Sequence, residues 1–136
     1  MNVGKKVFIT GASGGIGKAI CDKYKSNKYT LVLTSTSEEK IKILKERYGS
    51  DNYYYKVDIS NTKNIEDCIK DISQNHKDIS TIVNNAGITA DNLLLRMKNE
   101  QWSEVLKTNL DSNFLIIKGL LPNMLANKYG KIIGVS

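Results

Sequence analysis

The stretch Val7-Phe8-Ile9-Thr10-Gly11-Ala12-Ser13-Gly14-Gly15-Ile16-Gly17 joins a short apolar strand to a glycine-rich turn, and the residues after the turn have a helical composition. Glycines let the backbone turn tightly and approach a ligand, and the start of a helix offers unpaired N–H groups and a positive dipole end. An ordinary flexible loop fits less well, because a strand precedes the turn and a helix follows it. The stretch therefore predicts a site for the pyrophosphate of NAD or NADP, formed by Gly11, Ala12, Ser13, Gly14, Gly15, Ile16 and Gly17.

Apolar segments alternate with helical patterns along the rest of the chain. We expect strands at Lys6–Thr10, Thr30–Thr34, Asn52–Val57, Thr81–Asn84 and Lys131–Val135. One helix face is marked by Ile41, Leu44 and Tyr48, and another by Ile65, Cys68, Ile69 and Ile72, with Ser60 or Asn61 as the cap of the second helix. The alternation predicts an α/β fold of the Rossmann type, a doubly wound parallel sheet with helices on both faces. We expect residues 1–136 to form one dinucleotide-binding domain.

The longest helical pattern runs from about Glu100 to Ala126, with Asn99 as its cap and with Pro122 bending or stopping it. Its apolar residues at helical spacing are Trp102, Leu106, Leu110, Phe114 and Ile117. This stripe either packs entirely on the sheet or partly meets a second subunit, and the pattern leaves both interpretations open.

Composition narrows the classes of protein that the chain can belong to. It has 136 residues, 40% of them hydrophobic, which is enough for one folded domain. The net charge of +6 comes from scattered lysines without interleaved aromatic residues, so we expect no nucleic-acid site. No apolar run approaches membrane-spanning length, and Cys21 and Cys68 have no metal-ligand spacing. We therefore expect a cytoplasmic protein with reduced thiols, no metal and no membrane contact, and we assign His76 no role because its sequence neighbourhood suggests no partner.

Two motifs together resemble the short-chain dehydrogenase/reductase family. The first is Thr-Gly-x3-Gly-x-Gly from Thr10 to Gly17, and the second is Asn84-Asn85-Ala86-Gly87, which follows the apolar segment Ile79–Val83. The resemblance implies that Asp58 meets the adenine amino group and that Ile59 contributes a backbone N–H. A cap for the following helix is the alternative role of Asp58. The coenzyme ribose is expected beside Asn84, Asn85, Ala86 and Gly87.

The residues after the second strand decide between NAD and NADP. An acidic residue there accepts a hydrogen bond from the ribose 2′-hydroxyl and repels a 2′-phosphate. The sequence reads Thr34-Ser35-Thr36-Ser37 and has no carboxylate until Glu38. Ser35 and Thr36 can donate to a phosphate, so we expect NADP(H). Many NADP-using relatives carry Arg or Lys where this chain has Gly14, and Lys18 is a candidate to replace that charge.

Members of this family use an Asn, Ser, Tyr and Lys set for catalysis. The matching Asn is Asn109, within the long helix, where the resemblance implies that it holds a water that relays protons. A helix kink stabilised by its side chain is the alternative. Ser136 resembles the first of two paired serines of which the second is catalytic, and no Tyr-x-x-x-Lys follows. We expect the chain to be the N-terminal portion of a longer enzyme and to be inactive by itself.

The run from Gly87 to Met97, with Trp102 and Thr108-Asn109-Leu110, resembles the 3-oxoacyl-[acyl-carrier-protein] reductases of fatty-acid biosynthesis. The resemblance implies a homotetramer that reduces a 3-oxoacyl thioester to the (3R)-hydroxyacyl form with NADPH. The acidic acyl carrier protein would be the partner, and the candidate contacts are Arg96, Lys128 and Lys131. An acetoacetyl-CoA reductase is the nearest alternative, and a non-catalytic NADP-binding module is an alternative from another class.

Overall fold

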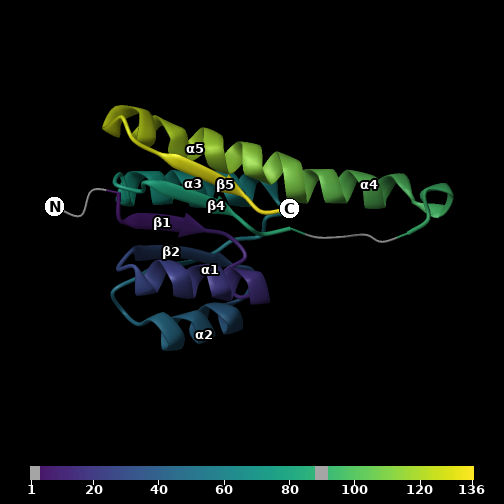
Figure 1. The fold of residues 1–136 in the computed structure, drawn as a ribbon. Helices are drawn as coiled ribbons and strands as arrows, with labels where there is room; N and C mark the ends of the chain where they lie inside the picture. Colours follow the sequence, from purple (N-terminus) through teal and green to yellow (C-terminus); the bar gives the residue numbers. More distant parts are fainter. Residues whose placement is uncertain (1–3, 88–91) are drawn as a thin grey trace.

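The computed structural model describes residues 4–87 and 92–136, in which five parallel strands form one sheet (Figure 1). The strands are β1 (Lys6–Ile9), β2 (Thr30–Ser35), β3 (Tyr53–Lys56), β4 (Thr81–Asn84) and β5 (Lys131–Gly134). Their order across the sheet is β3-β2-β1-β4-β5, with every neighbouring pair parallel. This arrangement confirms the predicted doubly wound fold. Ile88 to Asp91, part of the run that resembles the reductases, lie outside the described residues.

Helices cover both faces of the sheet because the strands alternate their apolar side chains. In β1, Phe8 faces a core shared with α3 (Thr62–Asn75) and α5 (Ser112–Asn127). Its neighbours Val7 and Ile9 face a second core, which α1 (Gly15–Ser26) and α2 (Glu38–Tyr48) cover. The side chains of Val7, Phe8 and Ile9 are fully buried, as expected for a central strand of a parallel sheet.

The caps of the shorter helices agree in part with the sequence. Ser37 caps α2 and its hydroxyl accepts a hydrogen bond from the Lys40 N–H at 3.3 Å. Of the two caps predicted for α3, Asn61 is the one observed, and its side chain accepts from the Asn64 N–H at 3.0 Å.

The long helix consists of three parts instead of one. These parts are α4 (Asn99–Leu106), a π-helical turn, η2 (Lys107–Asp111), and α5. A single-turn 3₁₀ helix, η1 (Leu94–Arg96), precedes α4. The prediction of Asn99 as the cap is wrong, because Lys98 precedes the helix and its N–H donates to the Gln101 side chain at 2.9 Å. Pro122 lies inside α5 and does not stop it. The helix ends at Asn127 and is followed by Lys128, whose φ of 54° is left-handed.

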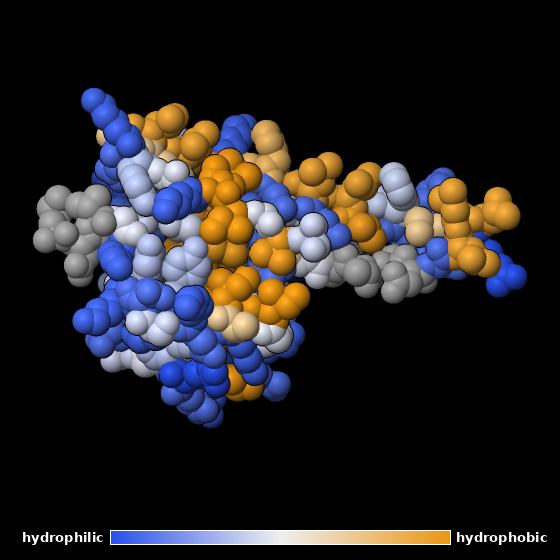
Figure 2. All heavy atoms as spheres, in the orientation of Figure 1, coloured by the Kyte–Doolittle hydropathy of each residue, from blue (hydrophilic) through white to orange (hydrophobic). Residues whose placement is uncertain are grey.

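The apolar stripe of this helix does not pack on the sheet, so that interpretation is wrong. The side of α5 that enters the core carries Ile116, Leu120 and Met124. Trp102 is 57% exposed and Phe114 is 61% exposed. A π turn holds an extra residue and rotates the helix face that follows it, so a stripe with uniform spacing cannot stay on one side. Figure 2 shows apolar residues gathered along the part of the molecule that α4 and the start of α5 occupy. Among the described residues, no helix is long and apolar enough to cross a membrane.

His76 has partners that the sequence did not suggest, so the earlier interpretation of it is wrong. The ring is buried at the amino end of the sheet, where Nε2 lies 2.8 Å from the Tyr55 hydroxyl and Nδ1 lies 3.5 Å from Lys6 Nζ. Lys6 also pairs with Asp78 at 2.8 Å. Burial, and then the charge of Lys6, lowers the pKa of His76 below its ordinary value. The histidine therefore helps to join β1, β3 and the end of α3, at the opposite end of the strands from the glycine-rich turn.

Candidate functional site

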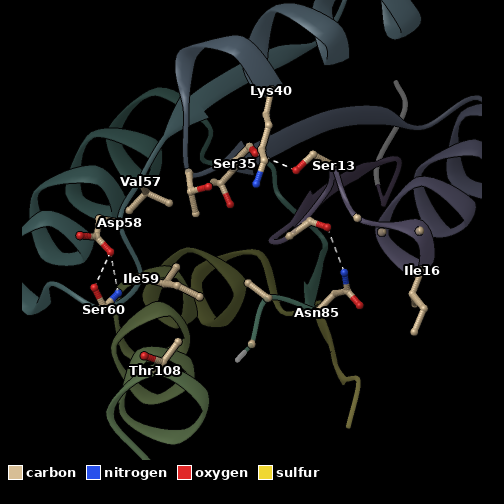
Figure 3. Close-up of a pocket in the computed structure, with 18 of the residues that line it drawn as sticks. Ser13, Ile16, Ser35, Lys40, Val57, Asp58, Ile59, Ser60, Asn85 and Thr108 are labelled. Atoms are coloured by element: carbon tan, nitrogen blue, oxygen red, sulfur yellow. Dashed lines mark hydrogen bonds between the residues drawn. The ribbon is translucent and has the colours of Figure 1, made fainter. Parts of the chain in front are cut away.

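A cleft of about 520 Å³ opens at the carboxyl ends of the strands. It lies where the strand order reverses between β1 and β4, which is where open α/β sheets bind ligands. The ends of β1, β2, β3 and β4 contribute to it, together with residues of α1, α2, α4 (Asn99–Leu106) and the π turn η2 (Figure 3). The lining residues are Gly11, Ser13, Gly14, Gly15, Ile16, Gly17, Thr34, Ser35, Thr36, Lys40, Val57, Asp58, Ile59, Ser60, Asn85, Ala86, Gly87, Glu104 and Thr108.

The glycine-rich turn needs its glycines for different reasons. Gly11 has a φ of +63°, and a Cβ there would lie 2.9 Å from the Ala86 Cα. A Cβ on Gly17 would collide with the carbonyl oxygen of Gly11, and Ala12 is buried beneath the turn. A Cβ on Gly15, in contrast, would meet nothing within 4 Å. Gly11 and Gly17 are therefore required by packing, whereas Gly15 leaves bare backbone facing open space. A pyrophosphate fits this arrangement, because the first turn of α1 begins there and its leading N–H groups lack helical partners.

Thr10 fixes the two sides of the cleft to each other, a role that the sequence analysis missed. Its hydroxyl oxygen accepts hydrogen bonds from the N–H groups of Asn85 and Ala86, both at 3.0 Å. The Asn85 side chain donates to the Gly11 carbonyl at 3.1 Å. The available signal was the position of Thr10, a hydroxyl residue at the end of a buried strand that opens the motif. These bonds set the separation between the glycine-rich turn and the segment after β4.

The end of β2 presents hydroxyls and one cation to the cleft. The hydroxyls of Ser13 and Ser35 lie 2.8 Å apart and share a hydrogen bond. Thr36 is exposed beside them. Lys40, from the first turn of α2, also lines the cleft, whereas Lys18 does not. The sequence analysis missed Lys40 because it expected the positive charge for a 2′-phosphate in or just after the glycine-rich turn, whereas Lys40 lies in the helix that follows β2.

Asp58 follows β3 and organises the turn there. Its Oδ1 accepts hydrogen bonds from the Ser60 hydroxyl at 2.6 Å and from the Ser60 N–H at 3.0 Å. These bonds lower the pKa of Asp58 below its ordinary value, so the carboxylate stays charged at neutral pH. Because Asn61 caps α3, the alternative role of Asp58 as the helix cap is not observed. Val57, Ile59 and Ser60 complete this wall.

The residues after β4 approach the π turn of the long helix. A Cβ on Gly87 would lie 2.8 Å from Oδ1 of Asn109, so only glycine allows this side chain to sit against the cleft rim. Asn109 does not itself line the cleft, and Asn84 is buried behind it. Thr108 and Glu104 line the wall formed by η2 and α4, and the sequence analysis missed both. The structure thus places thirteen of the predicted site residues on the cleft wall and the other three, Ala12, Asn84 and Asn109, next to it.

Neither cysteine offers a reactive group, and no metal site is evident in the part of the chain that the structure describes. Burial raises the pKa of the Cys21 thiol to about 12 and that of Cys68 to about 11. In residues 4–87 and 92–136, no group of three or more His, Cys, Asp or Glu side chains could hold a metal ion. The chemistry of the cleft therefore depends on backbone amides, hydroxyls, amides of Asn and a few charges.

A parallel sheet with a glycine-rich turn and a cleft at its switch point defines the Rossmann-type class of nucleotide-binding proteins. The family model for the short chain dehydrogenases matches residues 5–136, and the chain belongs to this family of oxidoreductases.

Relatives and solved structures agree with this family. The chain is 39% identical, over 132 residues, to the 3-oxoacyl-[acyl-carrier-protein] reductase FabG of Vibrio cholerae. That match covers 97% of this chain and 54% of the relative, so the chain spans about half the length of the curated relatives it matches. A metagenomic short-chain oxidoreductase solved in complex with NADP matches with a TM-score of 0.89 and 31% identity, covering 98% of this chain and 62% of that one. A short-chain dehydrogenase from Streptomyces avermitilis has a TM-score of 0.90 at 23% identity, over 100% of this chain and 50% of its own, and supports the fold alone.

Proposed function

We propose that the complete protein reduces 3-oxoacyl-[acyl-carrier-protein] to the (3R)-hydroxyacyl form with NADPH, in fatty-acid biosynthesis. Residues 1–136 would be its dinucleotide-binding domain. The observation that carries the proposal is the lining of the cleft. On one side the cleft is lined by exposed glycine backbone and the start of α1, which suit a pyrophosphate. At the end of β2 it is lined by hydroxyls and no carboxylate, which suits a 2′-phosphate. The FabG names of the relatives support the substrate class, and the NADP complex of a similar oxidoreductase supports the coenzyme.

Each part of the coenzyme has residues that fit it. The N–H groups of the turn from Ser13 to Gly17 would hold the pyrophosphate, and Ser35 and Thr36 would face the adenosine 2′-phosphate. The charged Asp58 and the backbone at Ile59 would hold the adenine, and Asn85 to Gly87 would border the ribose. Bound NADPH supplies the hydride. Asn109 would hold a water for the transfer of protons, and its place against Gly87 at the cleft rim supports this role.

We also propose that the complete protein is a homo-oligomer in which the exposed stripe on α4, η2 and α5 contacts another subunit. Trp102, Leu110 and Phe114 are each more than half exposed, and such a patch marks an interaction surface. Arg96, Lys128 and Lys131, the candidate contacts of the acyl carrier protein, are all exposed. They do not form one patch, however, since η1 precedes α4 at one end of the molecule and the turn from α5 to β5 lies at the other (Figure 1). Arg96 therefore cannot share one small contact with Lys128 and Lys131.

The test uses the protein expressed from its complete gene. Consumption of NADPH is followed with acetoacetyl-[acyl-carrier-protein] and with acetoacetyl-CoA in parallel, and we expect turnover that is faster with the carrier protein. Turnover with the CoA thioester alone would assign an acetoacetyl-CoA reductase instead. Failure with both thioesters would contradict the substrate class, and a reading frame that ends at Ser136 would favour a non-catalytic NADP-binding module.

A further inference from the structure

We propose that Lys40 selects NADP(H) over NAD(H) by holding the adenosine 2′-phosphate with its ammonium group. This inference rests on the proposed coenzyme and names a residue that the glycine-rich motif does not contain. Its basis is the position of Lys40 on the cleft wall next to Ser35 and Thr36.

The local structure holds Lys40 toward the cleft. Its N–H donates to the Ser37 hydroxyl in the cap of α2, which fixes the backbone of the first helical turn. In Figure 3 the side chain extends from the helix toward Ser35, and its nitrogen lies at the cleft. Only three residues separate Thr36 from Lys40, so the end of β2 and the start of α2 present a hydroxyl and a cation to the same wall.

One positively charged side chain faces this wall among the described residues. Lys40 is the only Lys or Arg among the described residues that line the cleft, and it forms no salt bridge within that part of the chain. Glu38 and Glu39 belong to the same helical turn but do not line the cleft. A phosphate at this wall would therefore meet an ammonium group with no competing ion pair, and charge-assisted hydrogen bonds of this kind are stronger than neutral ones.

The other residues that could bind the 2′-phosphate offer weaker interactions with it. Ser35 already shares a hydrogen bond with Ser13, and hydroxyls provide no charge to balance a phosphate dianion. Lys18 lies on α1 and does not line the cleft. Lys40 is thus the residue whose removal should affect ligands with a 2′-phosphate and spare those without one.

The experiment measures binding to the protein expressed from its complete gene by isothermal titration calorimetry. The ligands are NADPH, NADH, 2′,5′-ADP and ADP, and the variants are Lys40→Ala and, as a matched loss of one positive charge, Lys18→Ala. We expect Lys40→Ala to weaken NADPH and 2′,5′-ADP about tenfold and to change NADH and ADP by less than about twofold. Lys18→Ala should leave the ratio of NADPH to NADH affinity within about twofold of the unmodified protein.

The outcomes separate this inference from the proposed function. If the unmodified protein does not bind NADPH, or binds it no better than NADH, the proposed coenzyme is wrong and the inference falls with it. If the protein prefers NADPH and Lys40→Ala keeps that preference, the inference alone is overturned. Equal weakening of NADPH and NADH by Lys40→Ala would also overturn it, because that result indicates a structural role for Lys40.

Discussion

Replacing Thr10 with Val tests how the cleft is held open. Valine has the shape of threonine and keeps the apolar contacts of a side chain that is 1% exposed, but it removes the oxygen that accepts from the N–H groups of Asn85 and Ala86. Each neutral hydrogen bond contributes about 0.5–1.5 kcal/mol, so the two together should contribute about 1–3 kcal/mol to the free energy of unfolding. The loss should also release the segment after β4 and weaken coenzyme binding.

The assay is urea denaturation of the complete protein, with NADPH binding measured on the same samples. Thr10→Ser is the control, because it keeps the hydroxyl and should retain both the N–H bonds and most of the affinity. An unfolding free energy of Thr10→Val within about 0.5 kcal/mol of the unmodified protein would refute the reasoning, since such a change is the size of a surface substitution.

Two further predictions concern the glycines and the histidine. Gly17→Ala should destabilise the protein by about 1–3 kcal/mol, because its Cβ collides with the Gly11 carbonyl. Gly15→Ala should leave the melting temperature nearly unchanged and should weaken NADPH binding at least about tenfold. Equal melting temperatures of the two variants would contradict this contrast. Burial and Lys6 lower the pKa of His76 from its ordinary 6.5, so the folded protein favours the neutral ring and the unfolded chain takes up the proton first. Stability should be full above pH 6.5 and should decline as the pH falls from there toward the lower folded-state pKa. His76→Gln should flatten this part of a urea-midpoint profile, and a variant profile parallel to that of the unmodified protein would exclude the histidine as its cause.

The sheet could be predicted from the sequence because local patterns determine it. The apolar runs in β1, β2 and β4 are short and bounded by turn residues, and each predicted strand lies within two residues of the observed one. The glycine-rich turn could be predicted as well. Gly11 has a left-handed φ and Gly17 packs closely against the Gly11 carbonyl, and both conditions favour glycine, which the sequence shows directly.

The long helix and the charges of the site could not be predicted in the same way. The π turn at Lys107–Asp111 changes the helix face without any Gly or Pro to mark it, so the spacing of the stripe through Trp102 and Phe114 could not decide between packing on the sheet and exposure. Thr10 and His76 act through partners distant in sequence, as in the bond from the Ala86 N–H to Thr10 across 76 positions. Spacing within one element carries no information on such contacts.

Hydrogen–deuterium exchange of the complete protein with and without NADPH tests the central claim most directly. If the coenzyme binds in the cleft, NADPH should slow exchange of the backbone N–H groups from Ser13 to Gly17 and of those at Asp58 to Ser60 and Asn85 to Gly87, while β5 should be little affected. Unchanged exchange in the glycine-rich turn at a saturating NADPH concentration would contradict the account.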